Sequence, residues 1–327
     1  HQKRESVVGA VDFAHRYGFR TIHILIDNRA VDHGVWALER AREKGMLVQL
    51  WTKQDGLSDE EAAALRNRLD FPNVFAQMVM DEPELGTPSG VARDFLRKMR
   101  AAYPYHPVHM NNTVLGIPNR YADLETDILM LDDYLTNGEK RTVASVVDAV
   151  DHMWRAGLEE GKPCYYFLVG GNFPLHYREL SFAEQVAQTY GAIAAGCTGL
   201  SYFYGVPVTP GNWRAYIQLN REVRSLAGVL LSEETVENAR ASADPRMLRV
   251  LTKRRGGAVY VVACNIDEKP MGTVTVSLPA GLAAAGDAEV LFEDRRVPLA
   301  DGAFRDTFDG HTRHVYRVEL KEADKEE

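Results

Sequence analysis

The sequence predicts an α/β fold, a (β/α)8 or TIM barrel followed by a C-terminal antiparallel β-sandwich domain. Two observations predict it. From residue 5 to about 230, short apolar runs alternate with amphipathic helical segments, a pattern typical of parallel strands joined by crossover helices. After about residue 232 the chain is rich in strand-forming runs separated by Gly, Pro and Asp turns. We therefore expect a barrel at 1–232 and an accessory sandwich at 233–327, with Glu234–Pro245 as the connection.

The predicted parallel strands are seven apolar runs of strand length. They are Thr21–Ile26, Leu47–Trp51, Val74–Met80, Pro107–Met110, Ile128–Leu131, Cys164–Val169 and Gly199–Tyr204. A helical segment at Glu5–Tyr17 precedes them without a strand of its own, so we expect the barrel's first strand to be missing or to lie before His1. An open doubly wound sheet is the alternative, but no Gly-rich phosphate loop follows any of the runs.

Helical periodicity fills the intervals between these strands. The predicted helices are Asp32–Lys44, Ser58–Leu69, Ser89–Ala102, Val143–Gly157 and Phe182–Ala195. Ser58 and Glu61 have the spacing of a capping box, which marks the start of a helix. The predicted sandwich strands are Met247–Thr252, Ala258–Asn265, Gly272–Leu278, Ala288–Phe292 and His314–Leu320.

Composition bounds the class of protein. Of 327 residues, 45% are hydrophobic and 26% charged, which suits one large and one small globular domain. The net charge of -8 and the lack of a Lys/Arg block argue against a nucleic-acid or anionic-membrane partner. No apolar run approaches the ~20 residues of a membrane span. Cys164, Cys197 and Cys264 fit no metal-binding spacing, so we expect free, buried thiols.

The first residue of the sequence is His1 rather than a methionine. We therefore expect that a preceding segment was removed or left unseen, and any signal peptide would have gone with it. Both a cytoplasmic and an extracytoplasmic location remain open, as does the oligomeric state.

The most informative motif is the run from Val74 to Met80 that ends in Asp81-Glu82-Pro83. Barrel enzymes carry their catalytic groups at the C-terminal ends of the strands. Neighbouring strand residues point to opposite faces, so Asp81 and Glu82 can converge only if the strand ends there. Pro83 cannot continue the ladder, and it should bias Glu82 toward an extended conformation. The apolar strand and the neighbouring Asp81 should both raise the pKa of Glu82.

The other strand ends are polar as well. They carry Asp27 and Asn28, Trp51, Asn111 and Asn112, Asp132, Asp133 and Tyr134, Asn172, and Tyr204. Carboxylates and amides bind hydroxyl groups and aromatic rings stack on sugars, so this set suits a carbohydrate site. His109 lies within a strand and is expected to be a core histidine. No Gly-x-Ser-x-Gly elbow is present to indicate Ser/His/Asp catalysis.

The chain resembles retaining glycoside hydrolases that combine a (β/α)8 barrel with a trailing β-sandwich. The resemblance rests on Asp81-Glu82-Pro83, Asp127–Tyr134, Glu184–Tyr204 and Phe308–Tyr316. In the clan that includes β-galactosidases and cellulases, a Glu ending strand 4 is the acid/base, which maps onto Glu82 when the missing strand is counted first. Their nucleophile is a Glu ending strand 7. This sequence departs there, because Cys164–Phe173 contains no acid and Glu179 and Glu184 come too late.

The resemblance implies two ways to supply the second catalytic group. In barrel hexosaminidases similar to glycoside hydrolase family 123, an adjacent Asp-Glu pair supplies both the general acid and the residue that orients the nucleophile. Glu82 would then be the general acid, and Asp81 would orient the substrate's own acetamido nucleophile. Alternatively, Asp132 or Asp133 is the second carboxylate, with inversion expected at a separation of ~6.5–9.5 Å from Glu82 and retention at ~5–5.5 Å.

The sequence thus predicts a glycoside hydrolase that cleaves a glycosidic bond in a carbohydrate, with no cofactor. The expected catalytic residues are Glu82, Asp81, Asp132 and Asp133, and the expected substrate-binding residues are Asp27, Trp51, Asn111, Asn112, Tyr134, Asn172 and Tyr204. Two alternatives remain open. One is a non-catalytic carbohydrate-binding barrel, and the other is a metal-dependent barrel hydrolase that uses Asp27, Asp81, Glu82 and Asp132.

Overall fold

The computed structural model describes residues 2–27, 30–53, 57–114, 125–135, 141–171, 178–203 and 207–321. The chain divides into two compact units, each described below by itself. Unit 1 comprises His1–Asp132 and Arg155–Tyr165, and unit 2 comprises Asp133–Trp154 and Tyr166–Glu327. This division groups the last barrel elements with the sandwich. The predicted domain boundary at residue 232 stays a prediction.

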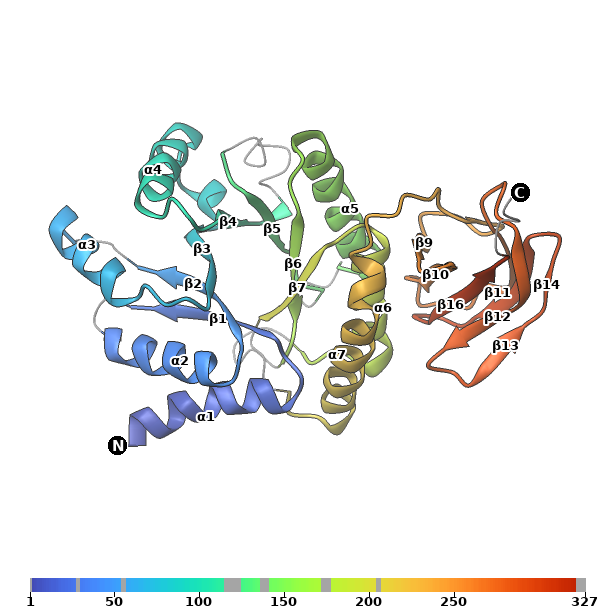
Figure 1. Cartoon of the computed structure of the whole chain (residues 1–327), viewed down its shortest axis with the longest axis horizontal. Coiled ribbons are helices and arrows are strands. Elements are labelled where there is room, and N and C mark those ends of the chain that lie inside the picture. Colours follow the sequence, from blue (N-terminus) through green and yellow to red (C-terminus); the bar gives the residue numbers. More distant parts are fainter. Residues whose placement is uncertain are drawn as a thin grey trace, which may run out of the picture. The chain divides into compact units, whose positions relative to one another are not determined.

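Seven strands form one sheet in unbroken chain order, β1 to β7 (Figure 1). They are β1 (Thr21–Ile26), β2 (Leu47–Thr52), β3 (Val74–Asp81), β4 (Val108–Asn112), β5 (Ile128–Asp132), β6 (Cys164–Val169) and β7 (Gly199–Phe203). The pairs from β1–β2 through β4–β5 are parallel. A doubly wound sheet would reverse its strand order. The unbroken order is that of a barrel, so the predicted fold class is confirmed.

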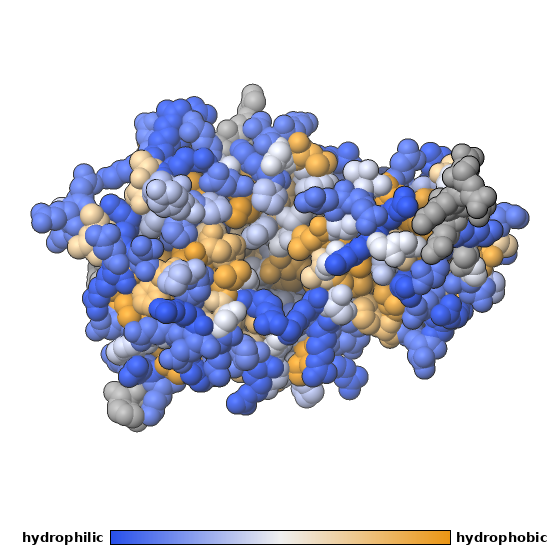
Figure 2. All heavy atoms as spheres, in the orientation of Figure 1, coloured by the Kyte–Doolittle hydropathy of each residue, from blue (hydrophilic) through white to orange (hydrophobic). Residues whose placement is uncertain are grey.

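Among the described residues, a helix lies between each pair of consecutive strands except β4 and β5. The helices are α1 (Gln2–Arg16), α2 (Val31–Glu43), α3 (Asp59–Arg68), α4 (Ser89–Ala102), α5 (Val143–Glu160), α6 (Phe182–Ala194) and α7 (Pro210–Leu230). Ser58 and Ser181 each form a capping box with the Glu three residues later, which fixes the first turns of α3 and α6. Hydrophilic side chains cover most of α3 and α4 on the face seen in Figure 2, as expected for helices on the outside of a barrel. Among the described helices, none combines the length and apolarity of a membrane span.

The C-terminal part is an antiparallel sandwich of two sheets. One sheet has the order β13-β12-β16-β10-β9 and the other β14-β15-β11-β8. The strands are β8 (Arg240–Ala241), β9 (Leu248–Arg255), β10 (Ala258–Asn265), β11 (Gly272–Ser277), β12 (Ala284–Leu291), β13 (Arg295–Val297), β14 (Leu299–Ala300), β15 (Ala303–Phe308) and β16 (Arg313–Leu320). Buried side chains from both sheets, among them Val261, Phe304 and Tyr316, share one core. The predicted sandwich is therefore confirmed.

The inward-facing residues of unit 1 include an unusual polar layer. Nε2 of Gln49 lies 2.6 Å from Nε2 of His109, and both side chains are buried. Burial lowers the pKa of His109 to about 3, so the imidazole is neutral at physiological pH. The expectation that His109 is a core histidine is confirmed.

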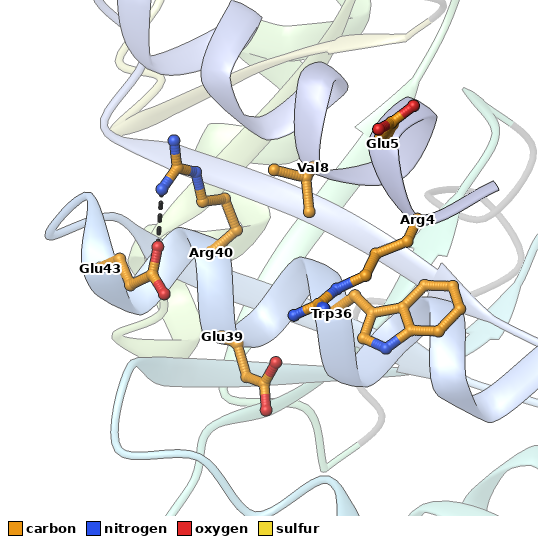
Figure 3. Close-up of a pocket in the computed structure, with 7 residues that line it drawn as sticks. All are labelled: Arg4, Glu5, Val8, Trp36, Glu39, Arg40 and Glu43. Atoms are coloured by element: carbon orange, nitrogen blue, oxygen red, sulfur yellow. Dashed lines mark hydrogen bonds and ion pairs between the residues drawn. The ribbon is translucent and has the colours of Figure 1, made fainter. Parts of the chain in front are cut away.

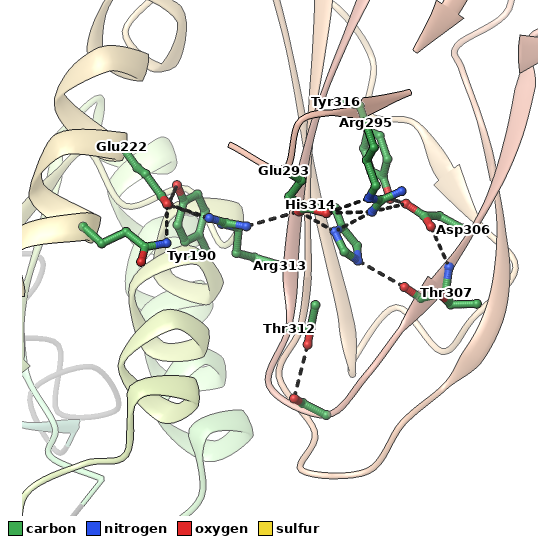
Figure 4. A network of polar contacts seen from close by, with 12 residues as sticks. Tyr190, Glu222, Glu293, Arg295, Asp306, Thr307, Thr312, Arg313, His314 and Tyr316 are labelled. Carbon is green, nitrogen blue, oxygen red and sulfur yellow. Dashed lines mark hydrogen bonds and ion pairs between the residues drawn. The ribbon is translucent and has the colours of Figure 1, made fainter. Parts of the chain in front are cut away.

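Unit 2 contains a buried ion pair between a helix and the sandwich (Figure 4). Nη2 of Arg313, on β16, lies 2.6 Å from Oε1 of Glu222, on α7. The hydroxyl of Tyr190, on α6, donates to Glu222 at 2.7 Å, and the guanidinium lies 5.3 Å from the Tyr190 ring centroid. These contacts fasten α6 and α7 to the sandwich.

The three cysteines are free thiols, as predicted. Cys164 and Cys264 are buried, and burial raises the pKa of each thiol to about 12. Cys197 differs from the prediction because it is only half-buried; its Sγ lies 2.9 Å from the backbone oxygen of Gly199.

Candidate active site

The strand β3 ends at Asp81, and Glu82 has left-handed backbone angles of φ 42° and ψ 49°. The prediction that Pro83 would hold Glu82 extended is therefore wrong. The backbone N–H of Glu82 donates to the carbonyl of Asn111 at 2.9 Å, so the chain pairs with β4 once more before it turns into the 3-10 helix Pro83–Leu85. A left-handed non-glycine residue costs about 1–3 kcal/mol and is concentrated at functional sites.

Three neighbouring strands bring their terminal side chains together. Asp81 of β3 pairs in register with Asn111 of β4, and Asn111 pairs with Met130 of β5, two residues before Asp132. Side chains two residues apart on a strand share a face, so Asp132 is placed on the same face as Asn111. Nδ2 of Asn111 donates to Oδ1 of Asp81 at 2.9 Å. Asn111 is 2% exposed and Asp132 is 8% exposed, which places both at the buried base of this cluster.

The carboxyl groups of Glu82 and Asp132 interact, and each affects the pKa of the other. Burial raises the pKa of Glu82, the charge of Asp81 adds to the increase, and the interaction with Asp132 opposes it. Burial raises the pKa of Asp132 to about 8, and the charge of Glu82 is the next cause. The two coupled carboxyl groups therefore share one proton at neutral pH.

Asp133 belongs to unit 2 and has a different environment. Burial raises the pKa of Asp133 to about 6, although Arg141 lies 2.7 Å away and acts in the opposite direction. The hydroxyl of Tyr166 donates to the backbone oxygen of Asp133 at 2.8 Å. Tyr134 is buried and stacks on Phe203 with ring centroids 5.3 Å apart, so its ring packs in the interior of unit 2.

The remaining predicted residues are not part of the carboxyl cluster. Asp27 follows β1 and is exposed. Trp51 is half-buried, and Nζ of Lys53 lies 5.3 Å from its ring centroid. Asn112 is buried, and its Nδ2 donates to the carbonyl of Met130 at 3.3 Å, a contact within the sheet. The positions of Asn28, Asn172 and Tyr204 fall outside the described residues.

Two residues that interact with the predicted site residues were not themselves predicted. The Glu84 carboxylate accepts a hydrogen bond from the backbone N–H of Thr113, and its charge contributes to the raised pKa of Glu82. The sequence feature that could have identified Glu84 is its position two residues after Glu82. Arg141 pairs with Asp133, and nothing in the sequence around Arg141 indicates this contact.

The structure gives no support to the metal-dependent alternative. Within the described ranges, no group of three or more His, Cys, Asp or Glu side chains has an arrangement that would hold a metal ion.

A cavity of about 340 Å3 lies on the outer helices of unit 1, between α1 and α2 (Figure 3). Trp36, Glu39 and Arg40 line it, and Arg4 extends over the Trp36 ring with 6.0 Å between the guanidinium carbon and the ring centroid. None of the predicted site residues lines this cavity. The candidate site is therefore defined by its carboxyl groups.

Comparisons with known proteins agree with the fold. No protein-family model matches the chain, and no curated protein matches its sequence. Among solved structures, an alpha-amylase from Anoxybacillus is similar with a TM-score of 0.64 and 11% identity, over 98% of this chain and 91% of that one. An alpha-amylase from Geobacillus thermoleovorans, solved in complex with acarbose, has a TM-score of 0.61 and 12% identity over 98% and 92%.

A GH30 endoxylanase from Clostridium papyrosolvens is similar with a TM-score of 0.58 and 12% identity, over 96% of this chain and 92% of that one. These structural neighbours are glycoside hydrolases. At such identities the likeness establishes the shared architecture alone, a TIM-like barrel with a sandwich.

Proposed function

We propose that the protein is a glycoside hydrolase, with Glu82 as general acid/base at the C-terminal end of β3. The observation that carries the proposal is the contact between the Glu82 and Asp132 carboxyl groups, with Asp81 and Asn111 beside them. A pair that keeps one proton at neutral pH has what a glycosidase needs to protonate a leaving-group oxygen. The glycoside hydrolases among the structural neighbours support this reading by analogy of fold.

The second catalytic group is the substrate's acetamido group in the version of the proposal that we favour. Asp81 is exposed and accepts a hydrogen bond from Asn111, so its carboxylate is oriented while remaining accessible to a ligand. An oriented carboxylate beside the acid can hold an acetamido N–H, as substrate-assisted catalysis requires. Asp132, in contact with Glu82, then serves as the proton partner of the acid.

The test is hydrolysis of a panel of aryl glycosides, with and without a 2-acetamido group, by the wild type and Glu82→Gln. We expect turnover of acetamido sugars, and a loss of at least about a hundredfold in the variant because general acid catalysis is removed. Activity should also fall as the pH rises toward 8, because the carboxyl pair loses its proton there. Undiminished activity in Glu82→Gln would contradict the assignment of the acid.

The panel also separates the alternatives. Turnover of sugars without the acetamido group would transfer the second catalytic role to Asp132 or Asp133. Binding of sugars without turnover by the wild type would support a non-catalytic carbohydrate-binding barrel.

A further inference from the structure

A second cavity, of about 320 Å3, lies in the outer layer of unit 1. Leu50 of β2 and Val74 and Gln77 of β3 line it, together with residues at the C-terminal ends of α3 and α4. Ala63 and Ala102 also line it, and their small side chains leave space there. Its volume is at the lower end of the ~300–1,000 Å3 of small-molecule sites.

This cavity is separate from the carboxyl cluster. It includes Val74, the first residue of β3, whereas Asp81 is the last residue of the same eight-residue strand. At a rise of ~3.3 Å per residue, the two ends of β3 lie about 20 Å apart. A ligand at the cavity would therefore occupy a different position from a substrate at Glu82.

An aromatic side chain stands at the rim of the cavity. Tyr105 lines it and is 93% exposed, more than any other large hydrophobic side chain of the described residues. Pro104 precedes Tyr105, and Pro107 follows His106, so the segment has little backbone freedom to lose on binding. The buried Tyr103 anchors it through an edge-to-face contact with His106, with centroids 6.3 Å apart.

Polar groups that suit hydroxyl recognition complete the lining. Asn67 and Asp70 are exposed at the end of α3, and Gln77 supplies an amide from the otherwise apolar floor. Amides both donate and accept hydrogen bonds, and a carboxylate accepts two or more. A ring for stacking beside an amide and a carboxylate matches a sugar, which has an apolar face and a hydroxyl edge.

We propose that this cavity is a second, non-catalytic carbohydrate-binding site, with Tyr105 stacking on a sugar ring and Asn67, Asp70 and Gln77 binding its hydroxyls. The choice of a carbohydrate rests on the proposed glycoside hydrolase function. Gln77, the lining residue of β3 nearest to Asp81, precedes it by four residues, about 13 Å along the strand, so the site can hold one part of a polymer chain while another part reaches Glu82. Its contribution therefore appears with polymers and not with small aryl glycosides.

The experiment is affinity electrophoresis of the full chain in gels that contain soluble starch, xylan, mixed-linkage glucan or glycol chitin. Glu82→Gln serves as the background, so that no polymer is consumed. We expect at least one polymer to retard this protein, and Tyr105→Ala to weaken the retardation roughly fivefold to tenfold through loss of stacking. Asp70→Asn should weaken it less. Leu158→Ala, which truncates another exposed side chain of unit 1 away from the cavity, should leave it unchanged.

In the otherwise wild-type chain, Tyr105→Ala should leave kcat/KM for small aryl glycosides unchanged. Equal retardation of the Tyr105→Ala and parent proteins, or no retardation by any polymer, overturns the proposed site. Tyr105-dependent retardation without hydrolysis of any substrate would reject the proposed catalytic function and leave the binding site standing. Hydrolysis together with retardation that does not depend on Tyr105 would reject the binding site and leave the proposed catalytic function standing.

Discussion

Asp132 illustrates how one buried carboxyl group can govern the pH behaviour of a site. It is 8% exposed and in contact with Glu82, and burial raises its pKa to about 8 from an ordinary 3.8. The proton that it keeps removes one negative charge from a cluster that also contains Asp81 and Glu84. Without this proton, adjacent buried carboxylates would repel one another.

A pH-dependent stability difference follows for Asp132→Asn. Because the folded-state pKa is raised, the stabilising protonated form is fully present below pH 3.8 and is lost as the pH rises through about 8. The wild type should lose stability over this interval. The Asn variant, which resembles the protonated carboxyl group, should not. At ~1.4 kcal/mol per pKa unit, the gap in unfolding free energy should widen by at least about 2 kcal/mol between pH 4.5 and 8.

Urea denaturation at several pH values measures this gap. Asp32→Asn is a suitable control because Asp32 forms an exposed surface pair with Arg68. Parallel stability profiles for the wild type and Asp132→Asn would show that Asp132 is ionised in the folded protein across the whole range.

At the scale of single elements, close helix–strand packing depends on a glycine in α5. A Cβ on Gly157 would lie 2.6 Å from Sγ of Cys164 and 2.8 Å from the backbone oxygen of Lys162. The backbone oxygen cannot rotate away, so Gly157→Ala should destabilise unit 1 by about 1–3 kcal/mol. Gly9→Ala in α1, where a Cβ meets nothing within 4 Å, should instead stabilise by about 0.5–1 kcal/mol. Denaturant midpoints of the two variants check this, and equal shifts in both would contradict it.

Elements with strong periodic signals were predictable, and those held by distant contacts were not. The bounds of β1, β6, β10 and α4 match the predicted ranges because each is an apolar or amphipathic segment between clear breaks. The strands β8 and β14 have two residues each, too few to show a period. They exist because β11 and β15 offer partners.

The candidate site shows the same limit. The strand ends and the polarity of their residues could be predicted because position along a strand is a local property. The left-handed turn at Glu82 could not, because it depends on the hydrogen bond from its N–H to Asn111 on another strand. The contact between Glu82 and Asp132 also depends on how far β3, β4 and β5 are shifted along one another. The register of strand pairing determines this shift, and it is not a local property of any one strand.

At the scale of the whole molecule, the Glu222–Arg313 pair decides whether the sandwich unfolds together with α6 and α7. The two side chains are 5% and 10% exposed. Removing one partner of a buried ion pair costs about 3–5 kcal/mol when the remaining charge has no other partner, so the cost here should be smaller. Nη1 of Arg313 also lies 3.2 Å from Oε1 of Glu293, but that contact lies within the sandwich and cannot replace the link to the helix.

Glu222→Gln should therefore split calorimetric unfolding into two transitions, whereas the wild type should unfold α6, α7 and the sandwich in one. The amide keeps the size of the side chain and can still accept a hydrogen bond from Tyr190, so the change isolates the lost charge. Asp244→Asn, at an exposed pair with Arg246, is the matched control and should leave the transition unchanged. A single transition in Glu222→Gln at the wild-type temperature would show that apolar packing between α6 and β10 alone couples the helices to the sandwich.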